Sequence, residues 1–390
     1  NVAALPLHNI DQIKCGNACR MDWEVVCPHA KDEEVFVFGN PPYLGSRNQE
    51  EEHKADMDIV FGNQKEFKGY RKLDYISCWF FKGAEYVANS DASYAFVSTN
   101  SITLGEQVSI LWNNMLNKYS ENIFFAYSVF KWNNNAKNVA GVSVVIIGVR
   151  KRDNSMKKLY NEVECKQLSH IPPTLSDSVD NMVKKATKSI SKLPYMRRGN
   201  MPNDKEFLRL SPLEKKDILE HYPNAVKFIR LQIGADELIN QVERYCYWIS
   251  DEDLEEAEKI MPIKNAIDKC REYRINSKDK TLHVQAEKAH QMREFFECNE
   301  MSLVIPIVSS ESREYIPMSF VPDKTIVPNS AQVIYDANLF VFGILTSKMH
   351  ILWTKHNAGR LDNRIRYSIF LCYNTFPFPS ISDTKKSEIE

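Results

Sequence analysis

The chain has 390 residues, a length that favours two domains, each large enough to bury a core of its own. Its 50 Lys and Arg residues nearly balance 51 Asp and Glu residues, and the net charge of −1 argues against a histone-like carrier or an acidic solvating chain. A nucleic-acid partner would therefore need a local basic patch. The longest aliphatic run, 142–149, is far shorter than the roughly 18 apolar residues of a spanning helix, so we expect no membrane partner.

Nine cysteines are spread through the chain, an odd number in a protein too large to need disulfide staples. This pattern predicts reduced thiols and a cytoplasmic protein, in agreement with a start that lacks the basic and apolar regions of a secretory signal. Cys15, Cys19, Cys27 and His29 lie close together in the sequence, but no pair has the usual C-x2-C spacing of a zinc site. We predict no metal site.

Glycine is scarce: its 13 residues are about 3% of the 390, whereas the usual share is about 7%. No two glycines are separated by a single residue anywhere in the chain. A dinucleotide or adenosine cofactor on a strand-to-helix turn normally needs such a G-x-G loop, because the backbone must approach the ligand closely. This chain has no loop of that kind.

Residues 34–151 alternate between short apolar runs and helical stretches, which is typical of an α/β fold. The predicted elements, in chain order, are a buried strand at 35–38, a helix at 73–84, a buried strand at 94–98, a helix at 106–119, and strands at 123–130 and 142–149. The polar loop 133–138 is short, so the last two strands should form an antiparallel hairpin that closes the sheet. This half is similar to the later strands of a doubly wound sheet.

Residues 152–205 are predicted to be irregular and to lead into a second domain. They carry a basic stretch, either a solvated face or a phosphate contact, made of Lys184, Lys185, Lys188, Lys192, Arg197 and Arg198. A long helical region follows from Ser250 or Asp251. The elements predicted after it are strands at 303–308, 315–320 and 332–335 and a helix at 338–355.

The segment Asn40-Pro41-Pro42-Tyr43 directly follows the strand predicted at 35–38, at the carboxyl end where α/β sheets place their ligands. Its prolines hold it extended, so that the amide oxygen of Asn40 and the carbonyl oxygen of Pro41 can face one way and accept both hydrogens of an exocyclic amine such as adenine N6. Tyr43 offers a face for stacking, and a base in a duplex must leave the helix to reach it. The alternative is a proline-rich turn that ends the strand.

The segment resembles motif IV of class I S-adenosylmethionine-dependent amino methyltransferases. More narrowly, the chain resembles the type IIL (MmeI-like) restriction-modification family, in which one polypeptide combines an N6-adenine methyltransferase, a DNA target recognition domain and usually an endonuclease. In the first half the resemblance rests on residues 16–23 and 40–45. In the second half it rests on residues 227–230, 244–248, 309–313, 315–317, 359–361, 366–368 and 371–377.

This resemblance implies an α/β fold: the C-terminal part of a Rossmann-like class I methyltransferase sheet followed by an α+β target recognition domain. Residues 1–155 would form a partial methyltransferase domain from the catalytic motif onward. Residues 156–205 would form a linker and the start of the second domain, residues 206–378 the DNA target recognition domain, and residues 379–390 a polar tail.

The resemblance also implies site residues. Residues 40–43 match the catalytic motif, and Phe130 matches the aromatic that packs against the flipped base, although Trp132 could take that role and Phe130 could be simple strand packing. Asn17 matches the position that contacts the adenine of S-adenosylmethionine. The family's glycine-rich motif I and acidic ribose-binding residue lie upstream of this chain, so we expect an incomplete cofactor site and a chain that is inactive alone. Magnesium is expected only if the parent protein has an endonuclease domain.

A local basic patch lies between residues 355 and 366. It holds Lys355, Arg360, Arg364 and Arg366 against one acid, Asp362. Charge alone allows a DNA-facing patch or a salt-bridged loop. The resemblance implies that Asp362 and Arg364 read one C·G pair, the acid accepting from cytosine N4 and the arginine donating to guanine O6 and N7. It also implies that Arg366 reads another position, whereas Arg360 could equally bind phosphate.

The leading prediction is sequence-specific N6-methylation of adenine in double-stranded DNA by a cytoplasmic prokaryotic restriction-modification protein. One alternative is a DNA-binding specificity fragment that catalyses nothing, because motif I is absent from the chain. Another is methylation of RNA or of a protein glutamine, since those enzymes share the Asn-Pro-Pro-Tyr signature. The long second domain argues against the compact glutamine enzymes but leaves RNA open.

Overall fold

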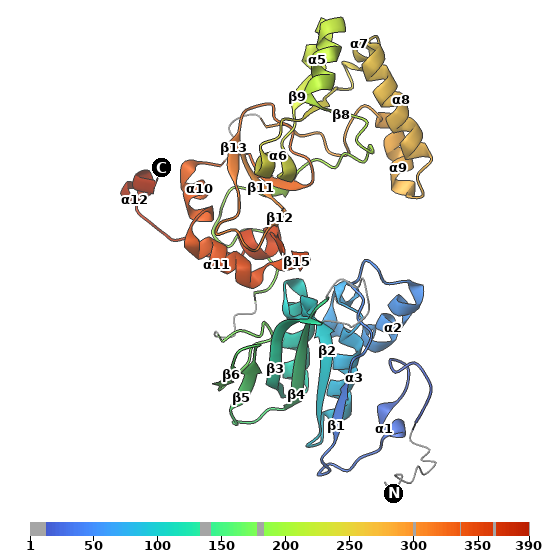
Figure 1. Cartoon of the computed structure of the whole chain (residues 1–390), viewed down its shortest axis with the longest axis vertical. Coiled ribbons are helices and arrows are strands. Elements are labelled where there is room, and N and C mark those ends of the chain that lie inside the picture. Colours follow the sequence, from blue (N-terminus) through green and yellow to red (C-terminus); the bar gives the residue numbers. More distant parts are fainter. Residues whose placement is uncertain are drawn as a thin grey trace, which may run out of the picture. The chain divides into compact units, whose positions relative to one another are not determined.

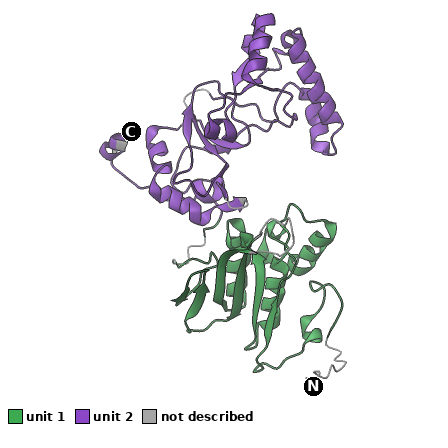
Figure 2. Ribbon diagram, in the orientation of Figure 1, with its two compact units in different colours: residues 1–184 green, residues 185–390 purple. Residues whose placement is uncertain are grey.

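The computed structural model describes residues 13–132, 142–177, 183–298, 302–335, 337–361 and 364–389. Two compact units make up the chain, residues 1–184 and 185–390 (Figures 1 and 2). The nine cysteines are free thiols. Within the described ranges, no helix is long and apolar enough to cross a membrane, and no group of three His, Cys, Asp or Glu side chains is placed to hold a metal ion.

The first unit is built on a six-stranded mixed sheet with the order β1-β2-β4-β3-β5-β6. Its strands are β1 (Phe36–Gly39), β2 (Ser93–Thr99), β3 (Glu121–Trp132), β4 (Val142–Lys151), β5 (Lys157–Tyr160) and β6 (Cys165–Leu168). β1 is parallel to β2, and both β2 and β3 are antiparallel to β4. β1, β2 and β3 therefore run in the same direction and end at one edge of the sheet, which we name the carboxyl edge.

Helices connect these strands and cover the sheet. They are α1 (Trp23–Val26), α2 (Glu51–Phe61), α3 (Ser77–Val87) and α4 (Asn113–Lys118), with the short turns η1 (Lys65–Phe67), η2 (Tyr70–Lys72), η3 (Asn100–Thr103) and the π-helical η4 (Val108–Trp112). α3 packs on β2 and β4, where Phe80, Phe81 and Ala84 are buried in one aromatic-rich core with Tyr94 and Trp112. This packing gives the carboxyl edge a rigid support.

The strands predicted in the first unit are confirmed, as is the antiparallel pairing of the last two. The loop predicted at 133–138 lies outside the described residues. β1 was expected to be buried, and this is wrong for one face, because Phe36 is 62% and Phe38 82% exposed. β1 is an edge strand of the described sheet, and the face that carries these two phenylalanines is uncovered.

Helix α2 was not predicted, because its apolar side chains are few. The helix predicted at 73–84 begins later, at Ser77. The stretch 152–205, predicted to be irregular, contains β5 and β6, which extend the first sheet beyond β3. These strands are four residues each and rich in lysine, so neither apolar runs nor alternation marks them strongly.

The second unit contains three small antiparallel sheets with the orders β8-β10-β9, β13-β11-β14-β7 and β12-β16-β15. Their strands are β7 (Met196–Arg198), β8 (Arg209–Leu210), β9 (Ile229–Leu231), β10 (Tyr245–Tyr247), β11 (Ser302–Pro306), β12 (Val308–Ser309), β13 (Ser319–Val321), β14 (Ala331–Ile334), β15 (Gly359–Leu361) and β16 (Arg364–Arg366). β7 is the third strand found inside the stretch predicted to be irregular.

The helices of the second unit are α5 (Pro212–His221), α6 (Ala235–Asn240), α7 (Leu254–Ala257), α8 (Met261–Ile275), α9 (Lys280–Gln285), α10 (Leu339–Leu345), α11 (Lys348–Asn357) and α12 (Asp383–Ile389), with the turns η5 (Pro223–Phe228), η6 (Ala286–Lys288) and the π-helical η7 (Ile369–Tyr373). The single helix predicted at 338–355 is two helices, because Ser347 caps a new start by accepting from the His350 N–H. The strand predicted at 315–320 is confined to Ser319–Val321.

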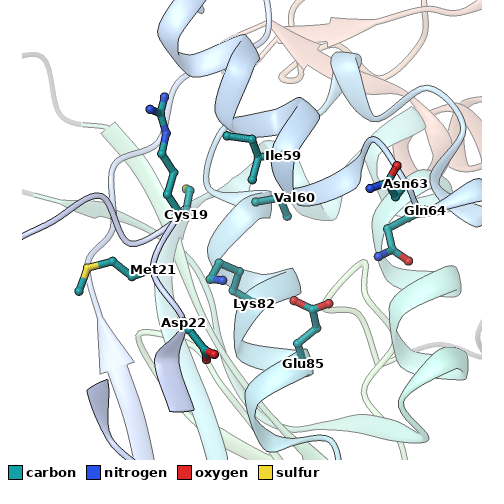
Figure 3. Close-up of a pocket in the computed structure, with 10 residues that line it drawn as sticks. Cys19, Met21, Asp22, Ile59, Val60, Asn63, Gln64, Lys82 and Glu85 are labelled. Carbon is teal, nitrogen blue, oxygen red and sulfur yellow. The ribbon is translucent and has the colours of Figure 1, made fainter. Parts of the chain in front are cut away.

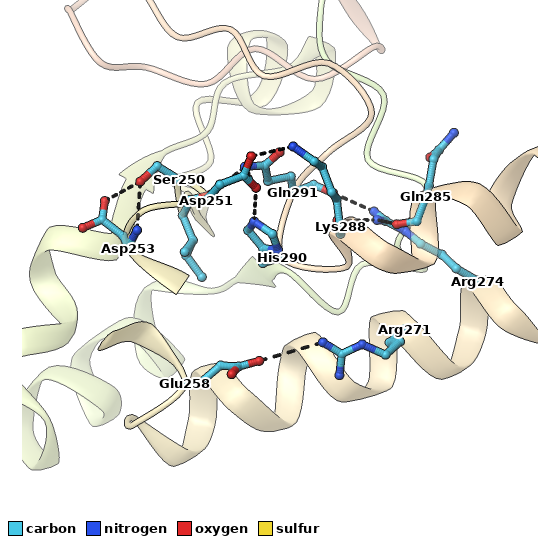
Figure 4. A network of polar contacts seen from close by, with 11 residues as sticks. Ser250, Asp251, Asp253, Glu258, Arg271, Arg274, Gln285, Lys288, His290 and Gln291 are labelled. Atoms are coloured by element: carbon cyan, nitrogen blue, oxygen red, sulfur yellow. Dashed lines mark hydrogen bonds and ion pairs between the residues drawn. The ribbon is translucent and has the colours of Figure 1, made fainter. Parts of the chain in front are cut away.

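The helical part of this unit is tied to the rest by a buried arginine. Arg274 on α8 is 1% exposed and donates five hydrogen bonds, all to main-chain carbonyls. Figure 4 shows it with Gln285, Lys288 and Gln291. The acceptors are Pro202, Asn203, Gln285, Lys288 and Gln291. One side chain therefore joins α8 to the segment before α5 and to the turn after α9.

Candidate functional site

The segment 40–43 lies at the carboxyl edge, directly after β1. The last residue of β1, Gly39, pairs with Phe96 of β2, which fixes where the segment leaves the sheet. Asn40 is exposed, Pro41 is buried, and Tyr43 is half-buried with its ring against the core. The amide of Asn40 is therefore accessible at the edge, while its neighbour Pro41 anchors the chain.

A buried carboxylate holds the end of this segment. Asp74 is 3% exposed, and its Oδ1 accepts a hydrogen bond of 2.8 Å from the main-chain N–H of Leu44, the residue after Tyr43. Its Oδ2 lies 3.2 Å from the hydroxyls of both Thr99 and Ser101, where β2 ends, and these two hydroxyls also hydrogen-bond each other at 2.6 Å. The exit of β1 and the exit of β2 are thereby joined through one side chain.

The carbonyl of Leu44 is held as firmly as its N–H. It accepts from the side-chain amide of Gln49 at 3.0 Å and from the main-chain N–H of Tyr75 at 3.0 Å. The same Gln49 amide also donates to the Leu73 carbonyl at 3.0 Å. Both polar groups of the Leu44 main chain are therefore fixed by buried partners.

Phe130 lies near the end of β3, at the same edge of the sheet as the segment 40–43. The pairing of β3 with β4 is irregular between Tyr127 and Phe130, which is a β-bulge, and the two rings lie 5.0 Å apart. Bulges re-aim side chains at functional edges. The side chain of Trp132, the other aromatic considered for this role, lies outside the described residues.

Asn17 is fixed by two hydrogen bonds. Its amide N–H donates to Asp56 of α2 at 2.8 Å, and its amide oxygen accepts from the Cys19 N–H at 2.9 Å. Asp56, 1% exposed, also accepts from Arg20 and from the Tyr75 hydroxyl, each at 2.6 Å. Burial raises the pKa of Asp56, but these hydrogen bonds outweigh burial and hold the pKa below its usual value, so the carboxylate is charged.

A surface hollow of about 380 Å³ lies beside the Asn17 loop. Cys19, Met21 and Asp22 line one side of it, and residues of α2 and α3, among them Lys82 and Glu85, line the other (Figure 3). None of residues 40–43 lines this hollow. It therefore lies apart from the motif at the carboxyl edge.

In the second unit, β15 and β16 form a hairpin that contains the predicted DNA-reading residues. Arg364 and Arg366 are exposed on one face of β16, with Ile365 buried between them. Arg360 is paired with Ile365 and so faces the buried side, where it donates to the Lys355 carbonyl at 3.1 Å. The structure brings Arg364 and Arg366 together and places Arg360 on the opposite face, and Asp362 lies outside the described residues.

The base of this hairpin is anchored at Tyr367, which directly follows β16. Its hydroxyl is 2.8 Å from Nε2 of His350, its carbonyl accepts from Gln332 at 3.0 Å, and its N–H donates to the Ile307 carbonyl at 2.8 Å. Burial lowers the pKa of His350 to about 3, so the imidazole is neutral. These contacts therefore hold in place the strand β16 that carries the two exposed arginines.

Comparison with known proteins assigns both halves of the chain. Residues 1–161 match the family described as "MmeI, DNA-methyltransferase domain", and residues 177–380 match "MmeI, target recognition domain". The chain belongs to the MmeI family. The resemblance inferred from the sequence motifs is thereby confirmed, as is the expected α/β fold with a recognition domain after the methyltransferase sheet.

Two known proteins illustrate the similarity. "DNA methyltransferase A" of Bacillus subtilis (strain 168) is 46% identical over 387 residues, which are 99% of this chain and 44% of that protein. The type IIL restriction-modification enzyme MmeI, solved in complex with DNA, matches with a TM-score of 0.88 and 35% identity over 96% of this chain and 50% of that one. The chain spans about half the length of these relatives.

Asp56, Asp74 and Gln49 were missed as candidate site residues in this MmeI-family chain. Asp74 stands alone between Leu73 and Tyr75 in an otherwise apolar segment before a helix, and a lone acid in that position is a signal for a capping or anchoring role. Asp56 and Gln49 carry no such signal. Their partners are separated from them in sequence and meet only in the fold.

Proposed function

We propose that this chain supplies the base-binding motif for transfer of a methyl group from S-adenosylmethionine to N6 of an adenine flipped out of double-stranded DNA, and that its second unit reads the DNA sequence. The observation that carries the proposal is the position of Asn40-Pro41-Pro42-Tyr43 at the carboxyl edge, in a unit that matches a DNA-methyltransferase domain. Ligands of α/β sheets bind at this edge.

Two acceptors at this edge suit the amino group of adenine. The amide oxygen of Asn40 and the carbonyl oxygen of Pro41 would each accept one N6 hydrogen, which pulls the nitrogen towards tetrahedral geometry and localises its lone pair. With S-adenosylmethionine bound, that lone pair would attack the methyl carbon in line as the bond from this carbon to the sulfonium sulfur breaks and leaves S-adenosylhomocysteine. The nitrogen would then lose one of its hydrogens to solvent as a proton. Since these contacts strengthen as positive charge develops on nitrogen, they stabilise the transition state more than the bound base.

Two aromatic side chains support a flipped base. Tyr43 belongs to the segment that follows β1, and Phe130 lies near the end of β3 at the same edge, so a base bound at this edge would contact both rings. Base stacking on an aromatic side chain contributes about 1–3 kcal/mol. That contribution offsets part of the cost of unpairing the base.

The residues present fit one side of a cofactor site. Asn17 is held by Asp56 of α2, and Tyr75, which lies in the turn before α3, donates its hydroxyl to the same carboxylate. S-adenosylmethionine, when bound, would supply the electrophilic methyl group. Among the described residues, β1 has no strand on its outer side, and its Phe36 and Phe38 are exposed, which supports pairing with a further strand that would bring a glycine-rich loop. The chain alone is then a weak or inactive catalyst.

The hairpin β15–β16 supports sequence reading by the second unit. Arg364 and Arg366 project from one face of a strand whose other face is buried, and a bidentate arginine is the commonest reader of guanine in the major groove. Arg360 faces the other way, so in this proposal it supports the hairpin through the Lys355 carbonyl.

A methyl-transfer assay tests the proposal. Full-length protein is incubated with tritium-labelled S-adenosylmethionine and either duplex DNA or structured RNA. We expect label in the N6-methyladenine of DNA alone, whereas preferential labelling of RNA would overturn the proposal in favour of the alternative substrate. Calorimetric titration of S-adenosylmethionine into the 390-residue chain then tests the incomplete site, for which weak binding or none is expected.

A further inference from the structure

Asp74 is a buried carboxylate with no cationic partner among the hydrogen bonds and ion pairs of the described residues. Burying a charge is costly unless hydrogen bonds compensate for it. Four donor groups surround it: the N–H groups of Leu44 and Ile76 donate to Oδ1, and the hydroxyls of Thr99 and Ser101 lie 3.2 Å from Oδ2. The two hydroxyls also share a hydrogen bond of 2.6 Å, so one of them donates to the other, which donates to Oδ2. The cost of removing this charge from water offsets much of the free energy that its hydrogen bonds contribute to folding. We therefore looked for a functional role of Asp74.

The four donors come from three segments that meet at the carboxyl edge. Leu44 follows the motif, Ile76 stands at the start of α3, and Thr99 and Ser101 lie where β2 ends. The main-chain N–H of Asp74 itself donates to Gln107 at 2.9 Å, which fixes the carboxylate from behind. The main chain of Asp74 is therefore held by a partner outside the motif.

Of these contacts, the one with Leu44 bears on chemistry. Leu44 is one residue from Tyr43 and three from Pro41, so its N–H sets where the chain turns after the two acceptors. A donor to a carboxylate forms a shorter and stronger hydrogen bond than a donor to a neutral group, and this one measures 2.8 Å. A misplacement of about 1 Å at a reacting centre costs on the order of 100-fold in rate.

We propose that Asp74 is a positioning residue for methyl transfer: its carboxylate, through the N–H of Leu44, holds the Asn40–Tyr43 segment in the geometry that binds the N6 amino group of the flipped base. This inference rests on the proposed function of that segment. It assigns no contact between Asp74 and the base or the cofactor. Its consequence is that the rate depends on an acceptor at Oδ1, not on the negative charge.

Three substitutions separate these roles. Asp74→Asn keeps an acceptor for Leu44, and the hydroxyls of Thr99 and Ser101 can turn to accept from its amide. Asp74→Ala removes every acceptor. Asp74→Ser keeps a short hydroxyl able to cap the Ile76 N–H at the start of α3, but it lies one bond closer to the main chain and does not reach Leu44. The serine variant keeps the proposal testable if the alanine variant does not fold.

Glu121 offers a matched control in the same sheet. It is also buried, 1% exposed, and it accepts a hydrogen bond of 3.0 Å from Tyr94. It begins β3 and so lies at the edge opposite the carboxyl edge. Glu121→Gln alters a buried carboxyl without touching the motif.

The experiment uses the full-length protein and a duplex with its recognition site. It measures kcat, KM for DNA, and the fluorescence of 2-aminopurine placed at the target adenine, which brightens on flipping. We expect Asp74→Asn to keep kcat within about tenfold, Asp74→Ala and Asp74→Ser to lose about 100-fold in kcat at unchanged KM, and Glu121→Gln to stay within about twofold.

Two results would overturn the inference. Equal loss of kcat in Asp74→Asn and Asp74→Ala would mean that the charge itself acts, and full kcat in the folded alanine or serine variant would mean that the Leu44 contact does not matter. Failure of the proposed function is a separate outcome, because the wild-type protein would then methylate no adenine in the same assay.

Discussion

The side-chain amide of Asn17 donates a hydrogen bond of 2.8 Å to Asp56, a carboxylate that is 1% exposed on α2. Tyr75 donates its hydroxyl to the same carboxylate and its main-chain N–H to the Leu44 carbonyl. The residue predicted to contact the cofactor and the segment predicted to bind the base are thus joined through two intermediates. A substitution of Asp56 should therefore disturb both the loop that holds Asn17 and the segment 40–43.

Substitution of Asp56 should destabilise the first unit. Asp56→Asn places an amide where Asn17, Arg20 and Tyr75 donate, so at least one donor loses its acceptor, at a cost of about 1–3 kcal/mol. The pKa of Asp56 lies below its unfolded value, so its stabilising contribution is present above about pH 4 and is lost as the pH falls through the folded pKa.

Urea unfolding of wild type and variant at pH 7 and at pH 3 measures this difference. The gap in unfolding free energy should be large at pH 7 and shrink at pH 3. Glu52→Gln, four residues earlier on α2, is the control, since Glu52 is exposed and its substitution should change stability by less than about 1 kcal/mol. An equal loss in both variants would contradict the role given to Asp56.

For Glu121 we expect the opposite dependence of stability on pH. Burial raises the pKa of Glu121 to about 8, while Tyr94 donates to one carboxyl oxygen and the other has no partner. Between about pH 4.5 and 8 the folded protein then holds a proton that the unfolded chain has lost, so stability falls as the pH rises. Glu121→Gln should remove this slope and stabilise the unit at pH 8 by on the order of 2–4 kcal/mol.

Denaturant unfolding at pH 5 and pH 8 checks the prediction for Glu121. Glu51→Gln is the matched control, because Glu51 is 93% exposed and its replacement should leave the pH dependence unchanged. A Glu121→Gln variant that is less stable than wild type at pH 8 would show that Glu121 is charged in the folded protein.

The lysines of the segment 184–192 should bind DNA phosphates. The segment is held against η7 by main-chain hydrogen bonds from Ala186 to Phe370 at 3.0 Å and from Ile190 to Asn374 at 2.8 Å. Lys184, Lys188 and Lys192 are exposed on it. Each Lys→Ala change should lower affinity for all DNA sequences alike and reduce the salt slope of binding by about 0.9 per lost phosphate contact.

Fluorescence anisotropy over a series of salt concentrations measures that slope. Lys259→Ala serves as the control, because Lys259 already forms an ion pair with Glu255 at 3.7 Å. An unchanged slope in the triple variant of residues 184, 188 and 192 would mean that these lysines face solvent and contact no phosphate.

Sequence reading by the hairpin predicts a reversal of specificity. If Asp362 accepts from cytosine N4 and Arg364 donates to guanine, then Asp362→Lys combined with Arg364→Asp exchanges donors for acceptors on both sides of the base pair. The recognised pair should change from C·G to G·C, whereas either single change should weaken binding. Long-read sequencing of cells that express the full-length double variant reports the methylated motif, and an active enzyme with an unchanged motif would refute the assignment.

The strands β1 to β4 and the motif of the first unit could be predicted because their signals are local. The apolar run 35–38 and the prolines that follow it specify a strand and an extended exit without reference to distant residues. Asp74 could not be given its role in this way. Its four donors span residues 44 to 101, and only the parallel pairing of β1 with β2 brings them together.

In the second unit, the sequence likewise did not show which face of the hairpin each arginine occupies. Arg360, Arg364 and Arg366 form one basic group in the sequence, but the register of β15 with β16 places Arg360 opposite Ile365 and turns it to the buried side. A change of register by one residue would exchange the faces, and spacing in the sequence does not fix that register. The exposed face of β1 was missed because an apolar run does not reveal whether both faces of a strand are covered.

The central claim is that Asn40 and its neighbours act on adenine N6 in DNA. Long-read sequencing of DNA from cells that express the full-length protein, as wild type or as Asn40→Ala, tests it directly, with DNA affinity measured in parallel. We expect N6-methyladenine at a single sequence motif with wild type, none with Asn40→Ala, and nearly equal affinity for DNA, because the acceptors act on the amine and not on the duplex. Unaltered adenine methylation in the variant, or methylation of another base by the wild type, would contradict the account.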